Sequence, residues 1–594
     1  MNKALPLVAI ALCISSTDTN AQNFADLDIG NVRARFHANG SIGTDDSGGL
    51  HFEVPRNSGI HALYASGLWI GGITSEEQLR VSRTLYPDGP PHFQPGPLSL
   101  TGTTTPQVST QFEQVWSIYA NDVVEHLAYH RCLGDPECDE AVEYPNGHTT
   151  PASFTQWPAH GPGPEYATNL APYYDFNSDG AYDPEDGDAP CIIGDQALFF
   201  VYNDAVSSVD HTPIGLEVQA MPFAFEYGSD AIRNTVFVRY HLINRSTLTL
   251  TGTRLGLFAD FDLGCSNDDY IGTDPGRNLF YTYNWDDDDE SGCSGTLGYG
   301  SHPPAFGSMF IKGPLIDANG MDDPSENLLP AYNGSGFGNA VTDDERAGLT
   351  NTAYWNREGA VPHGPGSHNL GLYNFLRSIW GDNTNITYGG TGASAASGIP
   401  THFVYPGADD PLGVGTNGIP QEPWYDTTHV YRDRRGVMST GEFTLEPGEH
   451  VDIVLAFIYA RDEDGTALES VAALQATADE VKLFCEGLPL FDGPEEQGFA
   501  GQCANYPTLA IAERNRFEEV AFFPTPAGNT VSVRLPESRI AGQLIVRDAL
   551  GRTVLTQRMT PQRNDLDMAA LVAGVYTAEI TFGTAHYKGT IVKE

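Results

Sequence analysis

The stretch from Asp175 to Asp186 carries oxygen-bearing side chains at the spacing of a calcium-binding loop. Positions 1, 3, 5, 9 and 12 of this stretch are Asp or Asn, and position 6 is a glycine. Calcium prefers several hard oxygen ligands, and this spacing is typical of a loop of the EF-hand type. The predicted ligands are Asp175, Asn177, Asp179, the backbone carbonyl of Ala181, Asp183 through a water molecule, and Asp186. The alternative is an ion-free loop that is held by Asx turns.

A second group of carboxylates follows a predicted strand and comprises Asp260, Asp262, Asp268, Asp269 and Asp274. Asp260 and Asp262 share one face of that strand, and carboxylates so close together repel unless a cation relieves them. We therefore predict a second metal site here, and calcium is the expected ion at both sites. Two alternatives stay open. The acids could be solvated ends of strands, or a pair of them could perform glycoside hydrolysis, which needs an acid and a base or nucleophile across a sugar.

No other stretch indicates a catalytic centre. The run of five acids from Asp286 to Glu290 is expected to be a solvated loop. The sequence contains no HExxH zinc motif, no G-x-S-x-G nucleophile motif and no phosphate-binding loop. Trp355 and Trp380 lie in a region rich in Tyr and Asn, and such residues could line a sugar-binding groove.

The elements that must position these acids are mostly strands. Alternation of apolar residues predicts strands over 221–227, 236–243 and 255–261, which we expect to form one antiparallel sheet. A strand, a turn and a strand are predicted over 62–72, further strands over 443–460, and either helix or strand over 111–126. Residues 300–430 should hide short strands, because a loop of that length is unusual in a compact domain. Thr466 and Glu469 form a capping box at the start of a predicted helix.

The ends of the chain predict export. Lys3 precedes an apolar run that ends at Ile14, which is typical of a signal peptide with cleavage after Ala21. No later stretch has enough consecutive apolar residues for a transmembrane helix. The net charge of −46 argues against nucleic acid and anionic membranes as partners. Export permits disulfides, and proximity in sequence suggests the pairs Cys132–Cys138, Cys265–Cys293 and Cys485–Cys503, which would leave Cys191 unpaired.

The last 80 or so residues form a separate unit. From Arg514 onward the chain has ten Arg or Lys and eight Asp or Glu, whereas the rest is strongly acidic. Five predicted strands in this span indicate a small immunoglobulin-like β-sandwich. It contains, in order, the motifs Phe523-Pro-Thr-Pro-Ala-Gly-Asn529, Asp548-Ala-Leu-Gly-Arg552, Leu571-Val-Ala-Gly-Val-Tyr576, Lys588 and Lys593. These motifs resemble the type A C-terminal sorting domain of the type IX secretion system, although Thr525 replaces the usual Asn.

That resemblance implies passage through the periplasm and the outer membrane, followed by removal of the domain and release or attachment at the cell surface. The rest of the chain resembles a group of large proteins that bear this sorting domain, and the resemblance implies no catalytic residues. The shared stretches are Ser66–Gly72, Asp175–Asp188 followed by Gly194–Gln196, Asp260–Gly264 with Asp268 and Asp269, and Asp433–Gly441.

Together these observations predict a mainly β protein in three parts: a signal peptide (1–21), an antiparallel β-sandwich body with long loops (22–510) that could hold two subdomains, and the sorting domain (511–594). The expected function is that of a calcium-stabilised, non-enzymatic protein that is secreted or held at the outer surface. It would serve in adhesion, surface structure or glycan binding, with the secretion machinery and an extracellular glycan or surface matrix as partners. The alternative is a secreted hydrolase that acts on polysaccharide or protein.

Overall fold

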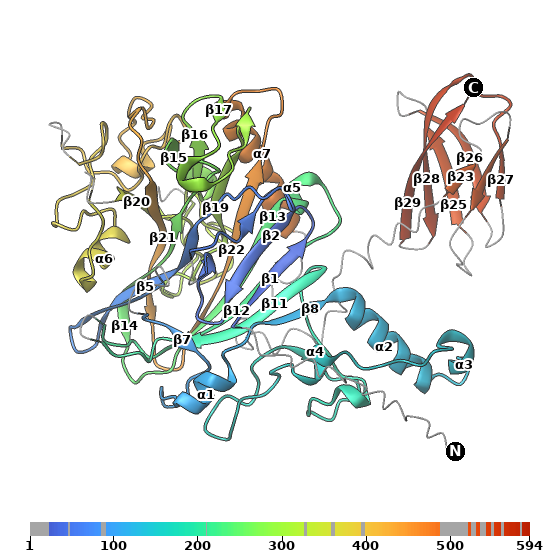
Figure 1. Cartoon of the computed structure of the whole chain (residues 1–594), viewed down its shortest axis with the longest axis horizontal. Helices are drawn as coiled ribbons and strands as arrows, with labels where there is room; N and C mark the ends of the chain where they lie inside the picture. The colour runs from blue at the N-terminus through green and yellow to red at the C-terminus, as the bar shows by residue number, and fades with distance from the viewer. Residues whose placement is uncertain are drawn as a thin grey trace, which may run out of the picture.

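The computed structural model describes the body of the chain and most strands of its C-terminal region. The described residues are 23–486 without 46–47, 85–90, 209–210, 326–328, 358–362 and 394–397, and then 521–523, 530–534, 542–547, 552–559, 564–582 and 585–593. The predicted signal peptide and the predicted boundary between residues 510 and 511 lie outside these ranges. The protein is mainly β, and its sheets are antiparallel, as predicted (Figure 1).

The body contains two nine-stranded sheets that face each other. The first has the order β1 (Phe24–Ile29), β2 (Val32–His37), β3 (Ile42–Gly43), β5 (Ala65–Thr74), β14 (Leu250–Asp260), β21 (Arg434–Leu445) and β20 (Asn351–Asn356), with β4 (Phe52–Glu53) on β2 and β6 (Leu79–Arg83) on β5. The second has the order β15 (Asp269–Asp274), β16 (Leu279–Asn284), β19 (Ala305–Lys312), β22 (His450–Ala460), β13 (Thr235–Asn244), β12 (Leu216–Ala224), β11 (Gln196–Asn203) and β7 (Gln94–Pro95), with β8 (Trp116–Tyr119) on β11.

Two apolar cores hold these layers together. The larger core lies between the sheets, where Leu257 of β14 and Phe36 of β2 join Val238 of β13 and Phe457 of β22. The second core covers the other face of the second sheet, where helix side chains pack on it. Burying a large aliphatic or aromatic side chain contributes about 1.5–3 kcal/mol, so both cores favour this layered arrangement.

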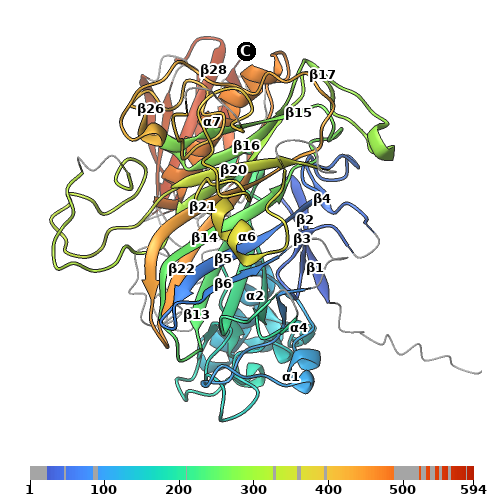
Figure 2. The same cartoon turned by 90° about the vertical axis from the view of Figure 1, so that its left-hand side faces the viewer.

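Helices are few and lie outside the sheets. They are α1 (Pro106–Gln111), α2 (Ala120–Gly134), α3 (Glu140–Glu143), α4 (Ala152–Thr155), α5 (Asp230–Arg233), α6 (Asn369–Phe375) and α7 (Ala467–Glu486), with 3-10 turns η1 (Pro184–Asp186), η2 (Pro275–Arg277), η3 (Cys293–Gly295) and η5 (Val414–Thr416). The longest, α7, packs on β19 and β22 (Figure 1; Figure 2 shows α7 and β22 from the side). Its capping box is confirmed, because Glu469 accepts the N–H of Thr466 at 2.7 Å and Thr466 accepts the N–H of Glu469 at 3.2 Å.

The described C-terminal strands form two sheets of their own. One has the order β23 (Ala521–Phe523), β24 (Thr530–Arg534) and β27 (Asn564–Asp567), and the other β26 (Thr553–Met559), β25 (Gly542–Arg547), β28 (Gly574–Phe582) and β29 (Ala585–Lys593). Side chains of both sheets, such as Val531 and Leu544, share one small core. This is the sandwich that the sequence predicts.

Two strand predictions are wrong. Residues 62–72 were expected to form a strand, a turn and a strand, but β5 begins at Ala65 and continues through Gly72 without a turn, and its glycines allow close packing instead. A Cβ at Gly67 would lie 2.4 Å from the Cβ of Thr84, so that position accepts only glycine without a shift of its neighbour. The strand predicted over 255–261 does not join the two before it. It is β14, which pairs with β5 and β21 in the opposite sheet.

Two regions that the sequence left undecided, 111–126 and 300–430, contain regular secondary structure. Residues 111–126 hold both alternatives, since β8 ends at Tyr119 and α2 begins at Ala120. The 300–430 region holds β19, β20 and α6. Trp355 and Trp380 do not line a groove there. They are 8% and 6% exposed, and both pack against Phe375 in the core between the sheets.

The cysteine pairing is partly confirmed. Disulfides join Cys132 to Cys138 and Cys265 to Cys293, as predicted. The third predicted pair is wrong, because Cys485 is a free thiol and Cys191 is disulfide-bonded. Cys485 belongs to the buried face of α7, where its side chain packs in the second core. It therefore acts as a small apolar residue, as buried free cysteines usually do.

Candidate metal centre

The second predicted group of acids lies where the chain crosses from one sheet to the other. β14 ends at Asp260 in the first sheet, and β15 begins at Asp269 on the edge of the second sheet. Residues 261–268 form the crossing loop. Two further segments lie beside it: the start of β21, and the two-residue ladder of β17 (Asp288–Asp289) with β18 (Gly300–Ser301). Three segments that are distant in sequence therefore place carboxylates in two adjoining groups.

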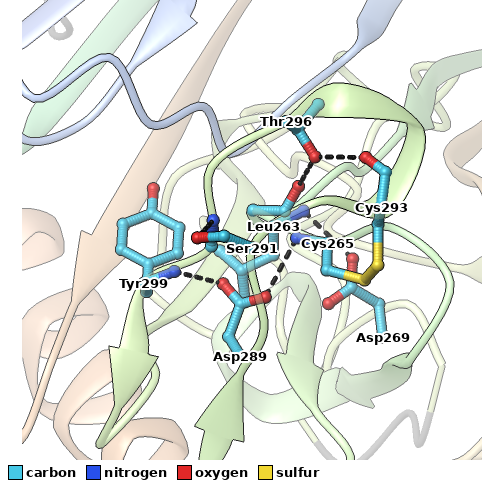
Figure 3. Close-up of a disulfide and its surroundings, with 10 residues drawn as sticks. Leu263, Cys265, Asp269, Asp289, Ser291, Cys293, Thr296 and Tyr299 are labelled. Carbon is cyan, nitrogen blue, oxygen red and sulfur yellow. Dashed lines mark hydrogen bonds between the residues drawn. A yellow bond between two sulfur atoms is a disulfide. The ribbon is translucent and has the colours of Figure 1, made fainter.

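Three buried carboxylates, those of Asp268, Asp269 and Asp289, form the core of the candidate metal centre. The Oδ1 and Oδ2 of Asp289 accept the N–H groups of Cys265 at 3.0 Å and Tyr299 at 2.5 Å, and the Oδ2 of Asp269 accepts the N–H of Leu263 at 3.0 Å (Figure 3). Both oxygens of Asp268 and the Oδ1 of Asp269 are buried, and no N–H or hydroxyl group of the described residues donates to them. Buried acceptors normally have partners, so these three free oxygens indicate a missing ligand.

A disulfide and a hydroxyl fix the loop around these acids. Cys265 of the crossing loop is bonded to Cys293, and Thr296 donates its hydroxyl to the carbonyl oxygens of Gly264 at 2.9 Å and Cys293 at 2.7 Å (Figure 3). The sulfur of Cys265 lies within 4.8 Å of carboxylate oxygens of Asp268 and Asp289. Because it is held in a disulfide, it offers no thiolate, and the centre has oxygen ligands only. Such a ligand set suits calcium.

The electrostatics of the centre require positive charge. Among the described residues, no nitrogen of Lys, Arg or His lies within 4.0 Å of the carboxylates of Asp268, Asp269 or Asp289, since none of the ion pairs includes them. Burial, with Glu290 and Asp289 nearby, raises the pKa of Asp268 to about 7. Burial also raises the pKa of Asp289 to about 6, and burial together with Asp268 raises that of Asp269. A divalent cation would reverse these shifts.

A second trio adjoins the first and contains Asp260, Asp262 and Asp433. One oxygen from each lies within 4.8 Å of the others. Here guanidinium groups already supply positive charge: Arg435 contacts Asp260 at 3.3 Å and Asp433 at 3.1 Å. Burial and then Asp433 raise the pKa of Asp262 to about 8, and the Oδ1 of Asp262 has no hydrogen-bond partner. The arginine makes this trio a weaker cation site than the first.

Asp274 lies apart from both trios, at the opposite end of β15. Its carboxylate pairs with Arg277 at 2.8 Å and accepts the side-chain amide of Gln475 at 3.1 Å. The sequence therefore grouped Asp274 with the other acids wrongly, because Asp269 and Asp274 lie at opposite ends of a six-residue extended strand.

The loop over 175–186 keeps the predicted shape, and its carboxylates bond to its own backbone. Asp175 accepts the N–H groups of Asp179 at 3.1 Å and Gly180 at 2.8 Å, and Gly180 has the positive φ of +80° that this position requires. The buried Asp188 closes the loop by accepting the N–H groups of Phe176 and Asp183, each at 2.8 Å.

No described α-helix directly flanks this loop. It is closed instead by the pairing of β9 (Tyr173–Tyr174) with β10 (Ala189–Pro190). The side chains of Asn177, Asp179, Asp183 and Asp186 are exposed, and Ala181 lies among them. The loop is not among the described groups in which three acidic, His or Cys side chains converge, and its calcium ion stays a prediction.

Sequence reasoning missed two of these acids, Asp289 of the centre and Asp433 of the second trio. Asp289 falls in the five-acid run that was expected to be solvated, and that expectation is wrong at this residue, which is 1% exposed. Alternation in β17 contains the signal, since neighbouring residues of a strand face opposite sides: Asp288 is exposed and Asp289 is buried. Asp433 had no local signal, because it lies far along the chain from Asp260.

Comparison with known proteins identifies the C-terminal region. A family model described as a secretion system C-terminal sorting domain matches residues 521–594, which confirms the resemblance to the type IX sorting domain. The protein is therefore exported by that machinery and is secreted or held at the outer surface. In the part of the chain that the structure describes, no helix has the length and apolar character to cross a membrane.

The comparisons with curated proteins and solved structures say less about the rest of the chain. No curated protein matches the chain. One similar solved structure is described as a polysaccharide lyase, with 9% sequence identity, 67% of this chain and 35% of that chain covered, and a TM-score of 0.18. The chain thus spans about a third of that protein, and a TM-score this low establishes no shared fold.

Proposed function

We propose that this exported protein is a calcium-stabilised, non-enzymatic binding or structural protein of the cell surface or the surrounding medium, with roles in adhesion, surface structure or glycan binding. The observation that carries the proposal is the buried trio of Asp268, Asp269 and Asp289, in which three oxygens have no donor and no carboxylate has an ion-pair partner among the described residues. Outside the cell calcium is plentiful, so even a weak site there would be filled.

The ion would brace the two sheets at their junction. It would join the crossing loop that follows β14 of the first sheet to the start of β15 in the second sheet and to β17, which forms a separate two-stranded sheet with β18. The loop over 175–186 would hold a second, exposed ion. Oxygens of the buried Asp268 and Asp289 lie within 4.8 Å of each other, and the charges of both raise the pKa of the buried Asp269. This arrangement suits an ion better than a pair of catalytic carboxylates that must reach a sugar from two sides.

Metal analysis and thermal unfolding test the proposal. The protein, purified in calcium and desalted, should retain about one calcium ion or more per chain, and removal of calcium by a chelator should lower the melting temperature by on the order of 5 °C. Magnesium should restore less of that stability, because it demands stricter octahedral geometry. A melting temperature that is the same with calcium and after chelation would contradict the proposal.

A further inference from the structure

A group of aromatic side chains lies on the surface beside the metal centre. The ring of Trp285 lies 4.8 Å from that of Tyr431 and 5.5 Å from that of His429, measured between centroids. Tyr270 lies beneath them, 6.3 Å from Trp285 and 5.9 Å from His429, and is itself buried. Tyr431 is 61% exposed, His429 is also exposed, and Trp285 is half-buried. We call Trp285, His429 and Tyr431 the aromatic platform.

The backbone that carries this platform is bonded to the residues of the metal centre. The N–H of Trp285 donates to the carbonyl oxygen of Asp268 at 3.0 Å, and the N–H of Arg432 donates to the carbonyl oxygen of Asn267 at 2.7 Å. The guanidinium of Arg434 donates to the carbonyl oxygen of Asp269 at 2.7 Å. The strand end after β16 and the loop before β21 are therefore both fixed to residues 267–269.

From this arrangement we infer that the aromatic platform binds an uncharged glycan, and that calcium at the centre holds the platform in its binding shape. This inference rests on the proposed function and extends it by naming the site and the class of ligand. Exposed aromatic rings stack on the apolar C–H face of a sugar, and they lose little conformational entropy when they do so. Carboxylates of the adjacent exposed residues Asp286 and Asp288 supply acceptors for sugar hydroxyl groups.

The charges and the ring spacing exclude two other occupants. Asp286, Asp287, Asp288 and Glu290 are exposed next to Trp285, and their field repels an acidic polysaccharide. A cationic group would need a cage with space between the rings. The rings of Trp285 and Tyr431 are in contact with each other, so they present an outer surface and no such cage.

Affinity electrophoresis of the full-length chain through gels that contain a polysaccharide tests the inference. The neutral probes are xylan, mannan, dextran and hydroxyethyl cellulose, with alginate as the acidic probe and polylysine as the cationic probe. We expect at least one neutral probe to retard the protein in calcium. Trp285→Ala and Tyr431→Ala should each weaken that retardation about tenfold, which corresponds to one lost stacking contact.

The matched control is Tyr227→Ala, which removes a tyrosine that is 54% exposed on the turn after β12. Tyr227→Ala should leave the retardation unchanged. Removal of calcium by a chelator should abolish the retardation of the wild-type protein. The inference is overturned if none of the neutral probes retards the protein, if only alginate or polylysine does, if Tyr431→Ala binds like Tyr227→Ala, or if chelation has no effect. These outcomes are separate from the melting experiment, so calcium could stabilise the body even where the glycan inference fails.

Discussion

The carboxylate of Asp289 accepts the backbone N–H of Cys265 at 3.0 Å, across 24 residues of sequence. This bond joins the β17 ladder to the loop that crosses between the two sheets. The disulfide between Cys265 and Cys293 spans the same two segments. The molecule thus uses a carboxylate and a covalent bond to hold one loop, and it leaves the neighbouring oxygens of Asp268 free to bind a cation.

The stabilising effect of calcium should grow with pH. In the calcium-free protein the pKa of Asp268 is raised to about 7 and that of Asp289 to about 6, above their unfolded value of about 3.9. Between about pH 4 and pH 7 the folded state therefore holds more protons than the unfolded state, and calcium-free stability falls as pH rises. Calcium needs ionised carboxylates, so the difference in melting temperature with and without calcium should be small at pH 5 and large at pH 8.

Differential scanning calorimetry at pH 5, 6, 7 and 8 measures this difference on protein that has been stripped of metal and on the same protein with added calcium. A difference that stays constant or shrinks toward pH 8 would show that these carboxylates do not bind the ion.

Loss of the disulfide should weaken the metal centre. The double variant Cys265→Ser and Cys293→Ser removes a bond that closes a loop of 28 residues, which costs about 3–4 kcal/mol of stability in the chain-entropy description. The crossing loop then loses its covalent anchor, so calcium titrations by isothermal calorimetry should show weaker binding. The control, Cys132→Ser with Cys138→Ser, removes a disulfide next to α2 and should leave calcium affinity at the centre unchanged. Equal affinities in both variants would show that the anchor plays no part.

Gly67 should not tolerate a side chain. In Gly67→Ala, the methyl group added within β5 would lie 2.4 Å from the side chain of Thr84, which follows β6. Overpacking of this kind costs about 1–3 kcal/mol. Gly134→Ala is the control, because a methyl group at the end of α2 meets no atom within 4 Å. Urea unfolding should show a lower midpoint for Gly67→Ala alone. A normal midpoint for that variant would mean that the strand shifts easily at this position.

Loss of the α7 cap should destabilise the body modestly. Thr466→Ala removes the side-chain acceptor for the N–H of Glu469, and such changes cost about 1 kcal/mol. Because α7 covers β19 and β22, the loss should appear in the unfolding of the whole body. Thr466→Ser keeps the acceptor and should unfold at the wild-type urea concentration, whereas equal losses in the two variants would argue against the cap.

Local patterns predicted local structure well. The capping box of Thr466 and Glu469 involves residues three apart, and alternation along β13 reports burial within one strand, so both are visible in the sequence. The pairing of strands is different, because it depends on which distant faces meet. For that reason β14 was placed beside β13, although it pairs with β5 and β21 in the other sheet.

The same limit applies to the metal centre. Asp268 and Asp269 were predicted as ligands from their spacing, and the structure gathers them. Asp289 and Asp433 reach the two trios only through sheet topology, which no spacing rule encodes. Asp274 shows the opposite error: it was grouped with Asp269 because the two are close in sequence. An extended strand rises about 3.3 Å per residue, so it places them far apart.

The variant Asp268→Asn tests the central claim most directly. No described donor reaches the carboxylate of Asp268, so the change mainly removes its charge and replaces one of its two oxygens by an NH2 group, which cannot bind a cation. At pH 8 without calcium, the variant should melt at a higher temperature than the wild type, because repulsion with Asp269 and Asp289 falls. With calcium the order should reverse, and the increase in melting temperature on adding calcium should be largely lost. Asp288→Asn, at the exposed neighbour of Asp289, should behave like the wild type in both conditions. A calcium-dependent increase in Asp268→Asn equal to that of the wild type would contradict the metal centre.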